Sequence, residues 1–130
     1  MKKTIFLIFA MCFAVSFINA QEVKDTSLVI TFIETTHDYG TIAQGSDGNY
    51  EFTFTNSGKT PLILSNVRSS CGCTIPVWTK DPIQPKGKGS IKVQYNTANV
   101  GTFQKSITVI SNAKNSPVIL TIKGNVIVKQ

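Results

Sequence analysis

The feature that most restricts the fold of this chain is a series of short stretches in which apolar and polar residues alternate. In residues 50–55, YEFTFT, the aromatic side chains of Tyr50, Phe52 and Phe54 alternate with polar ones. Residues 90–95 and 117–128 follow the same two-residue period. In a β-strand this period gives one buried and one solvent-facing side, whereas a helix needs apolar residues three and four apart. The pattern therefore predicts an all-β protein.

Turn-forming residues separate the alternating stretches at fairly even intervals, as in NSGK at residues 56–59 and PKGK at residues 85–88. Strands are expected at residues 28–34, 49–56, 61–67, 75–80, 88–96, 103–110 and 117–128. Because a parallel sheet would need helical crossovers, these seven short strands predict an immunoglobulin-like antiparallel β-sandwich. Trp78 and the phenylalanines are expected to be the largest contributors to its core.

The first 20 residues have the pattern of a secretory signal peptide. Lys2 and Lys3 precede an apolar run at residues 5–18, and the small residue Ala20 ends it. Cleavage there leaves 130 − 20 = 110 residues, which suits one domain. We expect a flexible segment at residues 21–28, a single domain at residues 29–130 and no transmembrane segment in the mature chain. The signal predicts an exported protein.

The charged residues form no recognisable catalytic or nucleic-acid-binding set. The net charge is +6, but the basic residues are scattered and form no stripe with aromatic residues, so no nucleic-acid partner is expected. No carboxylate pair has glycosidase spacing, and no phosphate-binding loop is present. Ser69 and Ser70 lie in no nucleophile elbow, and the lone His37 beside Asp38 is expected in a loop. The sequence thus predicts a protein without enzyme activity.

The most unusual local feature is SSCGCTIP at residues 69–76, which contains the only two cysteines of the predicted mature chain, Cys71 and Cys73. A disulfide between them needs a bend, which Gly72 permits, and chain entropy gives so small a ring only about 1.6 kcal/mol. A structural disulfide or thiol pair is therefore one interpretation, with a local effect. Redox activity is a second, although a Cys-x-x-Cys spacing at a helix start is absent. Copper is a third, as Cu(I) held by both thiolates, whereas zinc would lack ligands.

The chain resembles the bacterial domain-of-unknown-function family fifteen seventy-three in three segments: FTFTNSGKTPLILSNVRSSCGCTIPVW, PIQPKGKGSIKVQYNT and GTFQKSITVISNAKNSPVILTIKGNV. The resemblance covers residues 29–126. It implies an exported Ig-like sandwich of the periplasm or cell envelope, distantly similar to the Ig-like modules of Hydin-type proteins. It also carries over the motif Ser-Cys-Gly-Cys-Thr at residues 70–74. It brings no biochemical activity, so function has to be argued from the site.

The corner that contains the two cysteines is the candidate binding surface. Its candidate residues are Ser70, Gly72, Thr74, Pro76 and Trp78. A small sandwich without a catalytic set, but with free edge strands, favours a binding or structural module of the envelope. Its expected partner is an envelope protein or a glycan. The alternative is a thiol redox or Cu(I)-handling protein that uses Cys71 and Cys73.

Overall fold

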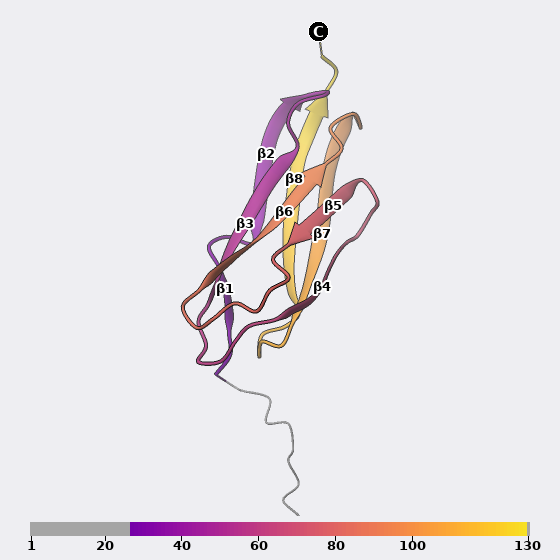
Figure 1. Ribbon diagram of the computed structural model, residues 1–130. Helices are drawn as coiled ribbons and strands as arrows, with labels where there is room; N and C mark the ends of the chain where they lie inside the picture. The colour runs from indigo at the N-terminus through magenta and orange to yellow at the C-terminus, as the bar shows by residue number, and fades with distance from the viewer. Residues whose placement is uncertain (1–26, 130) are drawn as a thin grey trace, which may run out of the picture.

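The computed structural model describes residues 27–129, which form eight β-strands and no helix. The strands are β1 (Ile30–Phe32), β2 (Thr36–Ala43), β3 (Asn49–Asn56), β4 (Leu64–Ser69), β5 (Thr74–Trp78), β6 (Lys88–Tyr95), β7 (Gly101–Ser111) and β8 (Val118–Ile127). They build two four-stranded sheets, a first sheet of order β1-β3-β6-β5 and a second of order β2-β8-β7-β4 (Figure 1). This arrangement is an immunoglobulin-like β-sandwich, which confirms the predicted fold class.

The strand missing from the prediction is β2. The chain leaves the first sheet after β1 and joins the second at Thr36, where β2 pairs with β8 in parallel. The expectation of seven antiparallel strands is therefore corrected to eight strands, with one parallel pair in the described part of the chain. The β2 sequence, THDYGTIA, contains Gly40 and has no clean apolar alternation, so its strand conformation depends on the neighbouring β8.

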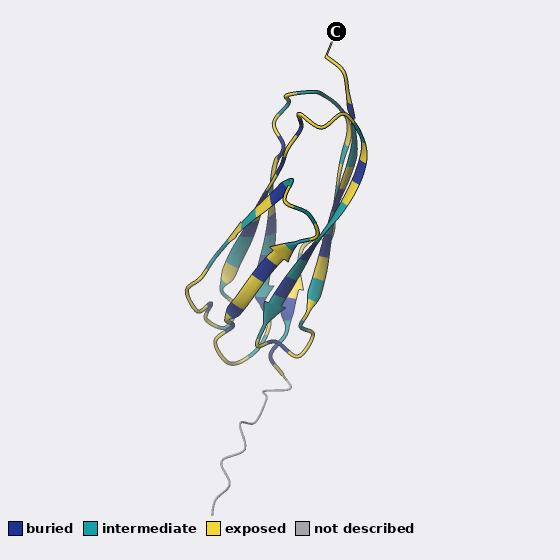
Figure 2. Ribbon diagram, turned by 90° about the vertical axis from the view of Figure 1, so that its right-hand side faces the viewer, coloured by how far each residue is buried: buried dark blue, intermediate teal, exposed yellow. Residues whose placement is uncertain are grey.

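Alternation along the strands decides which side chains form the core. Phe52 and Phe54 of the first sheet and Ile107 and Leu120 of the second are fully buried. Figure 2 shows buried and exposed residues alternating along the strands. Trp78 is half-buried and packs against the edge of this core, so its contribution is smaller than the sequence predicted. Apolar contacts between the two sheets thus supply most of the cohesion.

The predicted signal peptide lies outside the described residues, as does most of the predicted flexible segment. Leu28, the last residue of that segment, is buried in the core. Residues 27–129 contain no helix long and apolar enough to span a bilayer.

Residues 70–73 carry the chain from the second sheet to the first. They connect β4, an edge strand of the second sheet, to β5, an edge strand of the first. Thr74 at the start of β5 pairs with Tyr95 at the end of β6. The two cysteines therefore lie at a sheet-to-sheet corner, beside the loop that follows β6.

Candidate functional site

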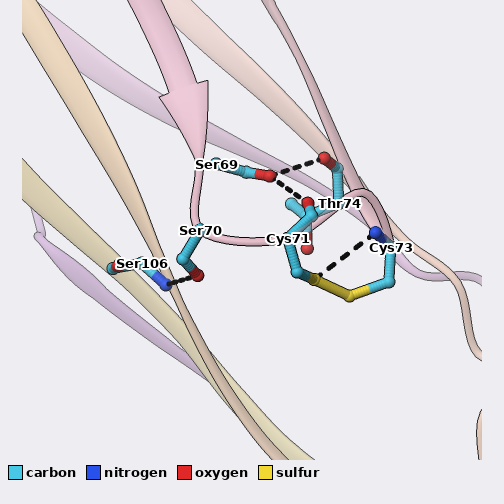
Figure 3. Close-up of a disulfide and its surroundings, with 6 residues drawn as sticks. All are labelled: Ser69, Ser70, Cys71, Cys73, Thr74 and Ser106. Atoms are coloured by element: carbon cyan, nitrogen blue, oxygen red, sulfur yellow. Dashed lines mark hydrogen bonds between the residues drawn. A yellow bond between two sulfur atoms is a disulfide. The ribbon is translucent and has the colours of Figure 1, made fainter.

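The corner is a tight turn closed by a disulfide between Cys71 and Cys73, whose Cα atoms are 5.4 Å apart (Figure 3). The Thr74 N–H donates to the Cys71 carbonyl at 3.4 Å, and the Cys73 N–H points to the Cys71 Sγ at 3.3 Å. Both cysteines are half-buried. The disulfide of the first interpretation is therefore present and has the local geometry that a one-residue separation requires.

The two serines ahead of the disulfide hold the turn in place. The Ser69 hydroxyl donates to the carbonyl oxygens of Cys71 and Thr74, the second at 2.9 Å. Ser70 accepts at its Oγ from the Ser106 N–H at 3.2 Å, and its own N–H donates to the Ser106 carbonyl at 2.9 Å. Both hydroxyls thus serve as turn hydrogen-bonding groups, which is the usual role of serine in such positions.

Gly72, at the tip of the turn, is exposed and has no structural need to be glycine. Its φ is not in the left-handed region, and a Cβ atom built on it would meet no atom within 4 Å. The bend at this position therefore does not use the conformational freedom that the sequence interpretation assigned to Gly72. A glycine here leaves the backbone of the corner open to close approach from outside.

The predicted corner residues of β5 face inward. Thr74 is buried, and Pro76 and Trp78 are half-buried on the same face of the strand. The opposite face carries Ile75 and Val77, with 61% and 59% of their surfaces exposed. These two apolar side chains are the surface residues that sequence reasoning missed. In TIPVW both alternating sets are largely apolar, so the pattern alone does not say which one faces water.

A groove of about 360 Å³ adjoins the corner. Its lining consists of Ser46, Asp47, Gly48, Asn49, Gly72, Cys73, Ile75, Gln94, Tyr95, Asn96 and Thr97. These residues come from the corner, from the loop before β3 and from the end of β6. The Asn96 N–H donates to the Cys73 carbonyl and the Tyr95 N–H to the Gly48 carbonyl, both at 2.9 Å, so backbone bonds fix all three segments. The open recess is therefore lined mostly by polar residues, including the carboxylate of Asp47, with Ile75 as its aliphatic side chain.

Tyr39 supports this groove from behind. Its hydroxyl donates to the Gly48 carbonyl at 2.8 Å, which anchors the loop before β3. Burial raises the pKa of Tyr39 to about 12, and the negative charge of Asp47 acts in the same direction. The phenol therefore remains protonated, and remains a donor, throughout the physiological pH range.

His37 lies in β2, not in the expected loop. Its ring stacks on Tyr50, with centroids 3.5 Å apart, and meets Tyr39 edge-on at 4.6 Å. An aromatic stack of this kind between the two sheets is a packing role. Residues 27–129 contain no group of three or more His, Cys, Asp or Glu side chains placed to hold a metal ion. The Cu(I) interpretation therefore rests on Cys71 and Cys73 alone.

One buried polar atom at the corner lacks a partner. Thr74 is 3% exposed, and its Oγ1 makes no hydrogen bond. Such an unpaired buried hydroxyl costs stability. The corner is therefore locally less optimised than the rest of the core.

The fold and the disulfide corner define a small immunoglobulin-like domain. The chain belongs to the family described as "Protein of unknown function (DUF1573)", whose model matches residues 30–126. A search of curated proteins found no match. The family assignment confirms the resemblance that the sequence segments predicted.

Solved structures that are similar to this chain support the same fold. A protein of unknown function from Porphyromonas gingivalis W83 matches with a TM-score of 0.67 and 18% identity, over 78% of this chain and 48% of that one. The human CEP192 PapD-like domain 7 matches with a TM-score of 0.65 and 10% identity, over 86% of this chain and 93% of that domain. The CupB2 chaperone of Pseudomonas aeruginosa matches with a TM-score of 0.53 and 9% identity, over 72% of this chain and 54% of the chaperone. The chain thus spans about half the length of the Porphyromonas protein.

Proposed function

We propose that this chain is an exported binding module of the bacterial cell envelope, without enzyme activity, which holds a partner protein or glycan at the Cys71–Cys73 corner. The fold similarity to PapD-like domains and to a chaperone supports a binding role. The signal-peptide pattern of residues 1–20 supports export. In this proposal the disulfide fixes the shape of the contact surface.

The observation that carries the proposal is the pair of exposed apolar side chains next to the groove. Ile75 and Val77 project from the outer face of β5, and Ile75 also lines the groove. Across the sheet Ile75 is opposite Gln94, and Val77 is opposite Lys92. An apolar pair surrounded by amide and ammonium groups has the composition of a small contact site, with an apolar centre and a polar margin.

The test is capture of the partner by the full-length protein in the envelope of the producing cells, using chemical cross-linking and mass spectrometry. The test variant is Ile75→Ser with Val77→Ser. The matched control is Ile119→Ser with Ile127→Ser, because these two side chains are 50% and 47% exposed on β8 of the other sheet. Retention on isolated envelope glycan, compared across the same variants, covers the glycan alternative.

We expect the β5 variant to lose the partner that the wild type and the β8 variant both retain. Urea unfolding of each variant checks that the substitutions leave the fold intact, since exposed positions usually change stability by no more than about 0.5 kcal/mol. Equal recovery of the same partner by both double variants contradicts the proposal.

The thiol redox or Cu(I)-handling function is the second candidate, favoured by the position of both half-buried sulfur atoms on an outer corner. Reduction by an added dithiol converts the disulfide to two thiols and oxidises the dithiol to its own disulfide. The reduced protein should then bind one Cu(I) ion, and Cys71→Ser or Cys73→Ser alone should abolish binding. Native mass spectrometry with and without reductant and Cu(I) measures this directly. A protein that binds no Cu(I) and exchanges with no dithiol contradicts this candidate.

A further inference from the structure

Four strands form the edges of this sandwich: β1 and β5 in the first sheet, β2 and β4 in the second. An edge strand directs every second backbone N–H and C=O away from its sheet, and these groups match only another extended backbone. Proteins usually block such edges. How each edge uses its outward groups therefore indicates where a partner strand can add.

The edge of β1 is blocked by a side chain. Across the β1–β3 pair the Ile33 N–H donates to the Thr53 carbonyl, and the Ser57 N–H donates to the Val29 carbonyl. Alternation therefore directs the backbone groups of Ile30 outward. The Ile30 N–H donates to Asn115 Oδ1 at 3.1 Å, and Asn115 Nδ2 donates to the Ile30 carbonyl at 2.9 Å. The Asn115 amide thus occupies the place of a partner strand.

The edge of β5 is blocked by the corner and by a proline. The Cys73 carbonyl accepts from the Asn96 N–H, and the Thr79 N–H donates to the Ser90 carbonyl. Alternation therefore directs the backbone groups of Thr74, Pro76 and Trp78 outward from the sheet edge, although their side chains face inward. Both outward groups of Thr74 are already bonded, its N–H to Cys71 and its carbonyl to Ser69. Pro76 has no N–H to offer. The first two outward positions of β5 therefore lack a free donor.

The edge of β2 is interrupted in the middle. Its register shifts between Asp38 and Thr41, and Gly40, with a φ of 67°, donates its N–H to Asp38 Oδ1 at 2.8 Å. At the end of the strand the Ala43 carbonyl accepts from the Ser46 N–H at 3.0 Å. A bulge of this kind twists an edge away from pairing.

At residues 66–68 the edge of β4 has none of these blocks, and at its last residue the Ser69 hydroxyl bonds to the Cys71 and Thr74 carbonyls of the corner. The Ser70 N–H donates to Ser106, so alternation directs Arg68 toward β7 and the backbone groups of Val67 and Ser69 outward. The register shift of β4 lies at its start, between Leu64 and Asn66. No strand within residues 27–129 pairs with this outer side of β4.

The charges on this part of the second sheet have one sign. The charged residues of β4, β7 and β8 are Arg68, Lys105 and Lys123, and these strands carry no carboxylate. Arg68 is exposed on β4 itself. Arg68 therefore favours an acidic side chain on a strand added beside β4, and the more distant lysines add only a weak, screened attraction.

We propose that β4 is the docking edge of the molecule: an extended segment of a partner protein with acidic side chains adds to the second sheet as a fifth strand. Its backbone pairs with Val67 and Ser69, and a carboxylate lies beside Arg68. This inference rests on the proposed binding function and makes its partner a polypeptide, whose strand leads along β4 directly to the disulfide corner.

The experiment selects binders from a displayed library of random peptides about ten residues long, enough for one strand. Amide hydrogen exchange of the full-length protein, measured by NMR with each selected peptide, then locates the bound strand. We expect enrichment of Asp and Glu, and at least about ten-fold slower exchange of the Val67 and Ser69 amides at saturation.

Charge-reversal variants test the acidic preference. Arg68→Glu should weaken peptide binding about five-fold, as expected for cross-strand charge pairs. The matched control is Lys123→Glu, an exposed position on β8 with the same change of charge, and it should weaken binding by less than about two-fold because long-range charge is screened.

Other outcomes overturn the edge proposal. Selected peptides that slow exchange only at another edge, or no peptide-dependent slowing at any amide, contradict it. Peptides that perturb only Gly72, Ile75 and the groove also contradict it, yet leave the proposed corner function standing. Slowing of Val67 that rises with protein concentration alone, without peptide, would make the partner a second copy of this chain.

Discussion

Two turns at opposite ends of the first sheet use polar groups in contrasting ways. Asn56, at the end of β3, is fully buried, and its Nδ2 donates to the carbonyls of Thr60 and Ile83, both at 2.8 Å. Its Oδ1 accepts from the Gly58 N–H at 2.8 Å. The disulfide corner is instead only partly buried, and it leaves the buried Thr74 hydroxyl unpaired. The Asn56 turn should therefore contribute more to the stability of the fold than the disulfide corner does.

The largest effect is expected when the Asn56 turn is broken. Asn56→Ala removes the three hydrogen bonds of a fully buried amide, two to the Thr60 and Ile83 carbonyls and one from the Gly58 N–H, which should lower the free energy of unfolding by about 3 kcal/mol. Urea unfolding measures this. The control is Asn96→Ala, which removes only an exposed bond to the Ala98 N–H and should cost less than about 1 kcal/mol. A similar loss in both variants would remove the contrast between the two turns.

Two glycines of the groove should respond differently to the same substitution. A Cβ atom on Gly48 would lie 2.1 Å from the Tyr95 carbonyl oxygen, a backbone atom, whereas one on Gly72 would meet nothing within 4 Å. Gly48→Ala should therefore destabilise the fold by about 2 kcal/mol, as overpacking does. Gly72→Ala should change stability by less than about 0.5 kcal/mol. Thermal unfolding of the two variants compares them, and a large loss for Gly72→Ala would show a structural need for glycine at the corner.

The contrast between these turns also separates what the sequence can predict from what it cannot. Strand β3, which contains Phe52 and Phe54, was predictable because alternation is local. The Cys71–Cys73 contact was predictable because the two residues are almost adjacent. Strand β2 was not, because pairing with β8 decides its conformation. His37 was misplaced in a loop for the same reason.

The bend at Cys71 and Cys73 was predictable from the sequence, but the exposed side chains beside it were not. Ile75 and Val77 alternate along β5 with Thr74 and Trp78, and both sets are largely apolar. Only the register in which β5 pairs with β6 therefore decides which of the two sets is exposed. The groove combines residues 46–49 and 94–97 with the corner, and no sequence pattern brings such distant segments together.

The disulfide should matter less than either the Asn56 turn or Gly48. Cys71→Ser with Cys73→Ser should cost no more than about 1.6 kcal/mol, because a ring this small barely restricts the unfolded chain. Reducing agent without urea should likewise leave the protein folded, as measured by circular dichroism. A urea titration of the double variant, followed by the same signal, measures the loss of stability. Unfolding by reductant without urea would mean that the corner, and not the sheet packing, holds the sandwich together.

Tyr39 links the groove to the core, and its titration should make the stability of the fold depend on pH in the alkaline range. Its pKa is raised to about 12 in the folded state, against about 10 in an unfolded chain, so the neutral phenol is favoured by folding. The contribution of the neutral Tyr39 phenol to the free energy of unfolding is complete below about pH 10 and is lost as the pH rises from about 10 to 12. Tyr39→Phe should cost about 1 kcal/mol at neutral pH, through the lost bond to Gly48. Above pH 10 the stability curve of the variant should fall less steeply than that of the wild type, and parallel curves would contradict this origin.

The smallest effect is expected at Thr74, and it should have the opposite sign. Thr74→Val keeps the shape of the side chain and removes the buried hydroxyl that has no partner. Without that unpaired group the free energy of unfolding should stay the same or rise by up to about 1 kcal/mol. Removing a polar group that is fully hydrogen-bonded, such as the Asn56 amide, would lower the free energy of unfolding. The sign of the change therefore distinguishes the two turns. If Thr74→Val proved destabilising by more than about 1 kcal/mol, the hydroxyl would have a partner in solution, and the corner would be as fully bonded as the Asn56 turn.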